Sequence, residues 1–277
     1  MGNFLNFNGK VYRSDKVFIG ANNRSLRYGD GLFETMKIQG GKIVMADDHF
    51  DRLWKGLQLL EFDIPITFSR ETLTKQILAL PGKNLHPRDV RVRLNVFRGD
   101  GGLNDAINNF PNYIIQTWIL PDHSNQLNSN GIVAGIYEDA RKTCDVFSNL
   151  KHNNFLPYVM GALHAKKMKW NDAVILNSYG RICESTIANI FYIKDNVVHT
   201  PALTEGCIAG VMRKNLLAKL PAISYEVIKK EVTVDDLLNA DEVFFTNSVS
   251  PIRWVQRIND KEYGNAIIQK IHAGLDL

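Results

Sequence analysis

Residues 89–98 read DVRVRLNVFR and give the clearest structural signal in the chain. Apolar side chains occupy every second position from Val90 to Val96, while Arg91, Arg93 and Asn95 stand between them. Successive side chains of a strand point to opposite faces, so this alternation predicts a strand with one apolar face and one basic face.

Turn signals on the N-terminal side of this strand predict two hairpins. Asn8-Gly9 separates residues 4–7 from residues 10–12, and Gly40-Gly41 separates residues 34–39 from residues 42–45. Both dipeptides readily adopt the positive φ angles of a two-residue hairpin turn. Together with a further strand at 113–120, they predict an antiparallel sheet.

Two amphipathic helices interrupt these strands. Apolar residues recur at helical spacing between Phe50 and Leu60, behind the acidic pair Asp47-Asp48. A second pattern includes Leu73 and follows Ser69, a residue suited to a helix N-cap. Residues 1–120 are therefore predicted to form an α+β domain.

The segment 121–131, PDHSNQLNSNG, is polar and aperiodic, which is typical of a linker. A chain of 277 residues also suits two domains of about 100–200 residues each. Beyond the linker, residues 132–277 mix strands and helices without strict alternation, which favours α+β over a doubly wound sheet. The strands are expected at 132–137, 172–177, 189–194 and 242–246, and the helices near 155–169, 210–219 and 264–274.

Composition argues against several classes of protein. The 33 Lys and Arg nearly balance the 29 Asp and Glu, and no block of like charges occurs. No segment approaches the roughly 18 apolar residues of a membrane span, and the N-terminus lacks a signal-peptide pattern. Cys144, Cys183 and Cys207 show no zinc spacing or disulfide framework. We therefore expect a cytoplasmic protein with no metal site and no nucleic-acid or membrane partner.

Three features could carry chemistry. Lys151, in SNLKHNN, is either a solvated surface lysine or a Schiff-base amine. Glu184 is either an exposed turn carboxylate or, if buried, the partner of a cation such as a protonated ring nitrogen. Residues 206–213, GCIAGVMR, are either a simple loop before a helix or a phosphate site made of backbone N–H groups. These features alone name no reaction.

Several motifs follow one another in an order that resembles the fold-type IV, or class IV, pyridoxal-phosphate enzymes. These motifs are YGDGLFE at 28–34, HFDRL at 49–53, KHNN at 151–154, Glu184 followed by NIF at 189–191, Thr200-Pro201, and the loop that ends at Arg213. The resemblance implies pyridoxal 5'-phosphate as the cofactor. It also implies two domains, an N-terminal α/β sandwich and a C-terminal pseudo-barrel, and a homodimer.

The resemblance also assigns roles. Lys151 would carry the cofactor as a Schiff base and transfer the substrate proton, and Glu184 would pair with the pyridine nitrogen. The cofactor phosphate would meet Arg52, the backbone amides of Val211 and Met212, and Asn247 with Ser248. Met212 stands where a threonine is common, so only its amide can serve. The substrate would meet Arg93, Tyr28 and Phe33.

The substrate signals conflict. Arg93 matches an arginine of branched-chain aminotransferases, and Leu103 replaces an arginine that lyases and D-amino-acid aminotransferases carry. The segment KHNNFL at 151–156 is closer to the lyase pattern. We therefore expect an aminotransferase that exchanges the amino group of a small amino acid, branched-chain or otherwise apolar, with a 2-oxo acid. The alternatives are 4-amino-4-deoxychorismate lyase, which makes 4-aminobenzoate and pyruvate, and a noncatalytic cofactor-binding protein, which the retention of Lys151 and Glu184 disfavours.

Overall fold

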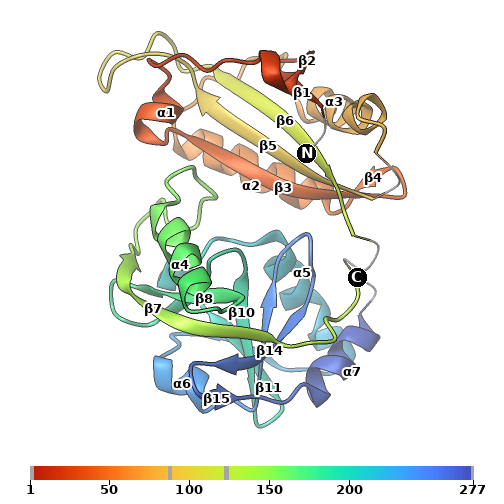
Figure 1. The fold of residues 1–277 in the computed structure, drawn as a ribbon, viewed down its shortest axis with the longest axis vertical. Coiled ribbons are helices and arrows are strands. Elements are labelled where there is room, and N and C mark those ends of the chain that lie inside the picture. The colour runs from red at the N-terminus through yellow and green to blue at the C-terminus, as the bar shows by residue number, and fades with distance from the viewer. Residues whose placement is uncertain (1–2, 87–88, 122–124, 276–277) are drawn as a thin grey trace. The chain divides into compact units, whose positions relative to one another are not determined.

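The computed structural model describes residues 3–86, 89–121 and 125–275 and contains two compact units (Figure 1). The first unit comprises Met1–Ser124 together with Leu150–Asn154, and the second comprises Asn125–Asn149 and Phe155–Leu277. The division after Ser124 falls inside the segment 121–131, of which residues 122–124 lie outside the described part. The return of Leu150–Asn154 to the first unit has no counterpart in the sequence prediction.

A six-stranded antiparallel sheet, in the order β2-β1-β6-β5-β3-β4, forms the framework of the first unit. Leu94 at the centre of β5 pairs with Glu34 of β3 on one side and with Ile115 of β6 on the other. Both predicted hairpins and the predicted strand at 89–98 are confirmed. The strands are β1 (Phe4–Phe7), β2 (Lys10–Arg13), β3 (Gly31–Gln39), β4 (Lys42–Ile43), β5 (Val90–Arg98) and β6 (Pro111–Ile119).

The helices of the first unit begin where the sequence offers caps. Ser69 accepts a hydrogen bond from the amide of Thr72 at 3.1 Å, which confirms the predicted start of α3. Asp47 and Asp48 lie in the first turn of α2, where carboxylates interact favourably with the helix dipole. The helical segments are η1 (Ser14–Lys16), α1 (Arg24–Tyr28), α2 (Ala46–Leu59) and α3 (Arg70–Lys83).

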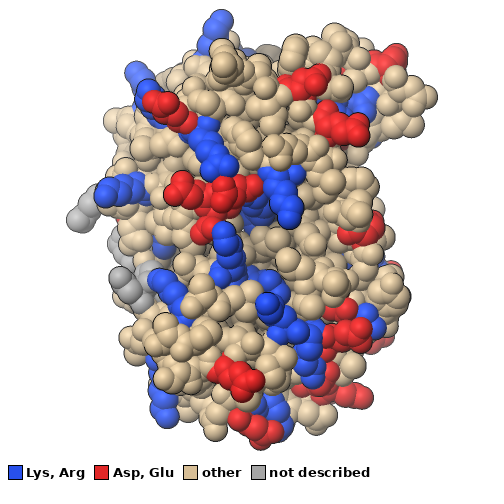
Figure 2. Space-filling view, turned by 180° about the vertical axis from the view of Figure 1, so that it is seen from behind, with Lys and Arg blue, Asp and Glu red and all other residues tan. Residues whose placement is uncertain are grey.

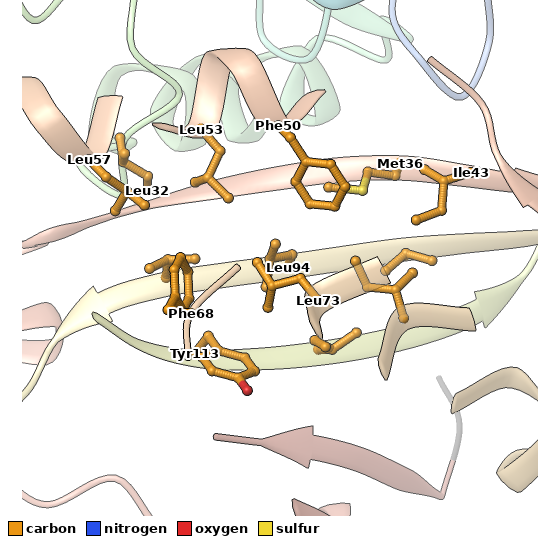
Figure 3. Packing of buried hydrophobic residues seen from close by; sticks show 14 of the residues in the cluster. Leu32, Met36, Ile43, Phe50, Leu53, Leu57, Phe68, Leu73, Leu94 and Tyr113 are labelled. Atoms are coloured by element: carbon orange, nitrogen blue, oxygen red, sulfur yellow. The ribbon is translucent and has the colours of Figure 1, made fainter. Parts of the chain in front are cut away.

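One core lies between the apolar face of this sheet and the apolar sides of α2 and α3 (Figure 3). Leu94 of β5, Leu53 of α2 and Leu73 of α3 are almost completely buried in it. A fully buried side chain of this size contributes about 1.5–3 kcal/mol. Because the alternating apolar residues of β5 face this core, Arg91 and Arg93 must lie on the opposite face of the sheet.

A nine-stranded mixed sheet dominates the second unit, in the order β12-β11-β10-β13-β14-β7-β8-β9, with β15 beside β14. It curls so that β9 also approaches β10 and β11, as a pseudo-barrel requires. The predicted strands at 172–177, 189–194 and 242–246 are confirmed. The strands are β7 (Ile132–Lys142), β8 (Asp172–Asn177), β9 (Ile182–Ser185), β10 (Asn189–Lys194), β11 (Val197–Pro201), β12 (Val227–Lys230), β13 (Glu242–Thr246), β14 (Arg253–Ile258) and β15 (Lys261–Glu262).

The strand predicted at 132–137 is longer than expected. A shift in register between Tyr137 and Arg141 lets β7 continue alongside β8 as far as Lys142. The helical segments around the sheet are α4 (Leu156–Lys167), η2 (Leu203–Glu205), α5 (Val211–Lys219), η3 (Pro221–Ile223), α6 (Val234–Leu238) and α7 (Ala266–Gly274). The β7 extension matters because it carries Lys142 into the interior, where this residue is only 5% exposed.

Within the described ranges, no helix combines the length and the apolar character needed to cross a bilayer. Acidic and basic side chains both occur across the face drawn in Figure 2. This mixture agrees with the small net charge of +4.

Candidate active-site residues

The segment around Lys151 runs alongside the start of β3. The amide of Phe33 donates to the carbonyl of Lys151, and the amide of Asn153 donates to the carbonyl of Gly31, both at 2.9 Å. A Cβ atom on Gly31 would lie 2.5 Å from the carbonyl oxygen of Val96 and 2.7 Å from Asn153 Nδ2, so this position requires glycine. The motifs YGDG and KHNN are therefore parts of one local structure.

The side chains of this structure bring three predicted residues together. Lys151 Nζ lies 4.6 Å from the centre of the Phe33 ring, and Arg93 Cζ lies 3.8 Å from the same centre. Cations at such distances are attracted to an aromatic ring. Tyr28 lies at the end of α1, and its ring contacts the guanidinium groups of Arg24 and Arg27.

Arg52 belongs to a buried ionic network in the first unit. Its Nε and Nη2 atoms bind the two oxygens of Glu34 at 2.8 and 2.5 Å, and His49 Nδ1 lies 2.7 Å from Glu34 Oε2. Burial alone would raise the pKa of Glu34, but Arg52 and His49 outweigh it and lower this pKa to about 2. Glu34 and His49 lie within the quoted motifs, although the sequence assigned them no role.

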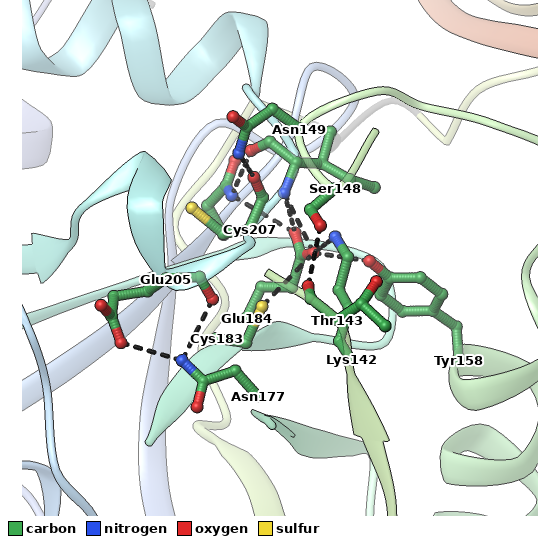
Figure 4. Close-up of polar contacts among 12 residues, drawn as sticks. Lys142, Thr143, Ser148, Asn149, Tyr158, Asn177, Cys183, Glu184, Glu205 and Cys207 are labelled. Atoms are coloured by element: carbon green, nitrogen blue, oxygen red, sulfur yellow. Dashed lines mark hydrogen bonds and ion pairs between the residues drawn. The ribbon is translucent and has the colours of Figure 1, made fainter. Parts of the chain in front are cut away.

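Glu184 lies on β9 and is 3% exposed, which excludes the interpretation as an exposed turn carboxylate. Its Oε1 atom accepts from Lys142 Nζ at 2.7 Å and from the Tyr158 hydroxyl at 2.6 Å (Figure 4). The amide of Ile208 donates to both carboxylate oxygens, at 3.0 and 3.1 Å. The cation that balances this buried carboxylate is therefore a lysine of the protein itself.

Sequence reasoning missed Lys142 and Tyr158, because nothing near Glu184 in the sequence points to them. Burial disfavours a charged lysine, but the charge of Glu184 outweighs it, so the pKa of Lys142 lies above its ordinary value. Burial and the same carboxylate raise the pKa of Tyr158 well above its ordinary value. Both groups are therefore hydrogen-bond donors to Glu184 at neutral pH.

Two buried thiols, those of Cys183 and Cys207, lie near Glu184. Burial and the neighbouring carboxylate raise the pKa of Cys207 to about 12 and that of Cys183 well above its ordinary value. A thiol with a raised pKa is a poor nucleophile at neutral pH. Cys183 and Cys207 are therefore poor candidates for a nucleophile.

Replacing Lys142 by methionine is expected to lower the free energy of unfolding by about 3–5 kcal/mol, because it leaves a buried carboxylate without its cation. Urea denaturation would measure this change. The stabilisation from Lys142 should be present at neutral pH and disappear as pH rises through its raised pKa. The exposed Lys167 of α4 provides the control: Lys167→Met should change stability by less than about 0.5 kcal/mol. Equal changes in both variants would contradict the prediction.

The residues around Glu184 fit a protonated ring nitrogen. Besides the shared amide of Ile208, Oε2 receives only a long contact of 3.4 Å from Asn189 Nδ2 among the described residues. A carboxylate oxygen can accept two hydrogen bonds, so a ring N–H at Oε2 would take the place of the long contact from Asn189. Asn189 Nδ2 also donates to the carbonyl of Ile208 at 2.9 Å, which joins Glu184 to the loop before α5.

The first turn of α5 fits a phosphate group. Gly210 is its N-cap, and Val211 and Met212 are the next two residues, so their amides have no acceptor inside the helix. Asn247 is differently placed, because its side-chain oxygen accepts from the amides of Val249 and Ser250 at 2.9 and 2.8 Å. Asn247 therefore caps its own turn. Ser248, the next residue of that turn, is half-buried.

The predicted site residues thus fall into two groups. The first unit contains Arg52, Lys151, Phe33, Arg93 and Tyr28, and the second unit contains Glu184, Val211, Met212, Asn247 and Ser248. In the first unit, Lys151 and Arg93 share one aromatic neighbour. In the second unit, Glu184 and the start of α5 share the loop that contains Ile208.

Residues 31–258 match the sequence model of the family Amino-transferase class IV, and the chain belongs to this family. An aminodeoxychorismate lyase of Vibrio harveyi is 31% identical over 241 residues, which cover 86% of this chain and 87% of the relative. A D-alanine aminotransferase of Bacillus licheniformis is 29% identical over 268 residues, which cover 94% and 89%. The expected family is therefore confirmed.

Solved structures confirm the predicted fold. A branched-chain aminotransferase from Thermoproteus uzoniensis, solved with norvaline, superimposes with a TM-score of 0.88 at 21% identity, over 99% of this chain and 93% of its own. A further branched-chain aminotransferase, solved with pyridoxamine 5'-phosphate, gives 0.86 at 20% identity, over 99% and 92%. The class IV family is dependent on pyridoxal phosphate, which confirms the expected cofactor. The chain therefore belongs to an enzyme class that includes both aminotransferases and aminodeoxychorismate lyases.

Proposed function

We propose that this enzyme transfers the amino group of a small amino acid, branched-chain or otherwise apolar, to a 2-oxo acid. The observation that carries the proposal is the position of Lys151 Nζ beside Phe33, with the guanidinium of Arg93 against the same ring. An amino-acid substrate must be anchored by its carboxylate while its α-carbon loses a proton. An amine next to a carboxylate-binding group meets both requirements.

Pyridoxal phosphate, when bound, supplies an electron-withdrawing ring that stabilises negative charge at the substrate α-carbon. Lys151 would hold the cofactor through a covalent bond to Nζ and, once that bond is broken, would move the proton from the α-carbon to the C4′ atom. Arg93 would orient the substrate carboxylate. Tyr28 remains a proposed substrate residue that rests on the family resemblance alone.

Glu184 would accept a hydrogen bond from the pyridine nitrogen through Oε2, while Lys142 and Tyr158 hold Oε1. The phosphate would meet the amides of Val211 and Met212 at the start of α5. Arg52, whose Nε and Nη2 atoms bind Glu34, remains a proposed phosphate residue. Asn247 and Ser248 also remain proposed phosphate residues, with the backbone of their turn as the more suitable donor.

The second candidate is aminodeoxychorismate lyase. The name of the Vibrio harveyi relative favours it, as does the segment KHNNFL. One observation opposes the lyase. Lyases carry an arginine at the position of Leu103, which is an exposed apolar residue here. We also propose that the enzyme is a homodimer and that it is located in the cytoplasm, as expected from the sequence.

Product analysis separates the candidates. The enzyme with added pyridoxal phosphate would be incubated with amino acids of either configuration and with several 2-oxo acids, and the products identified by mass spectrometry. Amino-group exchange is expected for at least one pair. Formation of 4-aminobenzoate and pyruvate from aminodeoxychorismate, without exchange, would establish the lyase instead. Cofactor binding without any turnover would support the noncatalytic alternative.

A further inference from the structure

Glu184 is already paired with a cation of the protein itself. Lys142 Nζ and the Tyr158 hydroxyl both donate to Oε1, at 2.7 and 2.6 Å, and all three residues are buried (Figure 4). Lys142 Nζ also lies 5.4 Å from the centre of the Tyr158 ring, so the ammonium group contacts both partners. Such a cation weakens a carboxylate whose single task is to keep a ring nitrogen protonated, because a like charge nearby disfavours the charged form of that nitrogen.

The sheet itself holds this ion pair together. Lys142 of β7 pairs in register with Asn177 of β8, and Ile175 of β8 pairs with Glu184 of β9. The two charged residues therefore come from strands on either side of β8. Their ion pair depends on regular strand pairing and on the extension of β7, and not on a surface loop.

The other ionisable groups near Glu184 leave Lys142 as its direct counter-charge. Cys183 Sγ lies 4.0 Å from Oε1, but burial and the carboxylate raise the pKa of Cys183 and that of Cys207, so both thiols are neutral. Arg213 is also buried, and burial lowers its pKa; its Nη2 atom donates to the carbonyl of Pro201 at 2.8 Å. In the described part of the chain, Lys142 is the cation that forms an ion pair with Glu184.

The two oxygens of Glu184 have different surroundings. Oε1 binds Lys142 and Tyr158, whereas Oε2 receives the shared amide of Ile208 at 3.1 Å and the long contact from Asn189 at 3.4 Å. A ring N–H at Oε2 would therefore share one carboxylate with the ammonium group at Oε1. Two cations that share one carboxylate repel each other, so each makes the charged form of the other less favourable.

We infer that Lys142 controls the proton occupancy of the cofactor's ring nitrogen and keeps it lower than an unshared Glu184 would. This inference rests on the placement of the cofactor in the proposed function, because it takes Glu184 as the partner of that nitrogen. A less protonated ring withdraws electrons less strongly, so Lys142 limits how far negative charge at the substrate α-carbon is stabilised. Lys142 acts through Glu184 and is therefore a positioning residue.

The test is an NMR titration of the protein loaded with pyridoxal phosphate whose ring nitrogen is isotopically labelled. The chemical shift of that nitrogen reports its protonation directly and requires no turnover. In Lys142→Met the pKa of the ring nitrogen should rise by about one unit or more, which is roughly a tenfold gain in proton occupancy. Lys142→Arg keeps a positive charge at this position and should stay close to the wild-type titration.

Two further variants identify the charge as the cause. Tyr158→Phe removes the other donor to Oε1 without removing a charge, and should shift the ring nitrogen less than Lys142→Met does. Lys167→Met, at an exposed position of α4, should leave the titration unchanged. An unchanged titration in Lys142→Met, or an equal shift in Tyr158→Phe, would overturn the inference. If Lys142→Met does not fold, Lys142→Gln keeps a donor, loses the charge and must show the same rise.

A cofactor analogue with C–H in place of the ring nitrogen gives an independent measurement. When the analogue binds to wild type, Glu184 keeps Lys142 as its counter-ion, whereas in Lys142→Met the carboxylate is left without a cation. Exchanging the cofactor for the analogue should therefore weaken binding about tenfold more in Lys142→Met than in wild type. Equal losses in both proteins would show that Lys142 is only a structural partner of Glu184.

These measurements also separate the inference from the proposed function. A ring nitrogen whose titration depends on Lys142, in a protein that exchanges no amino group, would reject the proposed function and retain the inference. Amino-group exchange with a titration that does not respond to Lys142 would do the opposite.

Discussion

Replacing Lys151 by alanine is expected to abolish amino-group exchange, with a loss of at least about 10⁴-fold. The same variant should lack the visible absorption band of a lysine-bound cofactor, which borohydride bleaches in wild type. The physical reason is that Lys151 Nζ is the amine that the fold places against Phe33, beside Arg93. Its removal takes away both the covalent bond and the group that carries the proton.

The spectrum and the activity must change together for this prediction to hold. Lys151 also contributes its backbone carbonyl to the hydrogen bond with the Phe33 amide, which alanine retains, so the fold should persist. Lys55→Ala, at an exposed position of α2, is the control and should keep both the band and the activity. A band that survives in Lys151→Ala would assign the cofactor to another lysine. No band in wild type would mean that the motifs persist without the chemistry.

Replacing Glu184 by glutamine is expected to reduce turnover about 10²-fold while the affinity for the cofactor changes less. A neutral amide would no longer keep the pyridine nitrogen protonated. The structure adds a second consequence, since Lys142 would keep its buried charge without a counter-ion. Glu184→Gln should therefore also lower the free energy of unfolding, by about 3–5 kcal/mol.

The double variant Lys142→Met with Glu184→Gln separates these two effects. It removes both charges, so much of the stability should return, while turnover stays low. Urea denaturation and steady-state kinetics on the four proteins of this cycle would measure both quantities. Recovery of turnover together with stability would show that Glu184 acts only as a structural partner of Lys142.

Local patterns along the chain predicted a large part of the fold. The alternation at 89–98 led to β5, the dipeptides Asn8-Gly9 and Gly40-Gly41 led to hairpins, and Ser69 led to the start of α3. Each of these signals acts over a few residues. Helix α6 carries a local signal of the same kind, a capping box in which Thr233 and Asp236 satisfy each other's amides.

Other elements were missed because their stability comes from partners distant in sequence. Strand β14 pairs in parallel with β7, more than a hundred residues earlier, and the extension of β7 depends on a shift in register against β8. A short segment such as β12 shows no clear alternation of apolar and polar residues. Its pairing with β11 is what makes it a strand.

The sequence by itself determined the family and the cofactor, and it singled out Lys151 and Glu184 as candidates, because these inferences depend on which residue types follow one another in order. Only the tertiary structure decided the environment of each residue. Lys142 and Tyr158 meet Glu184 from 42 and 26 residues away, and Arg91 Nε is buried without an acceptor among the described residues. Burial, charge balance and hydrogen bonding arise from contacts between distant segments, and no local pattern encodes them.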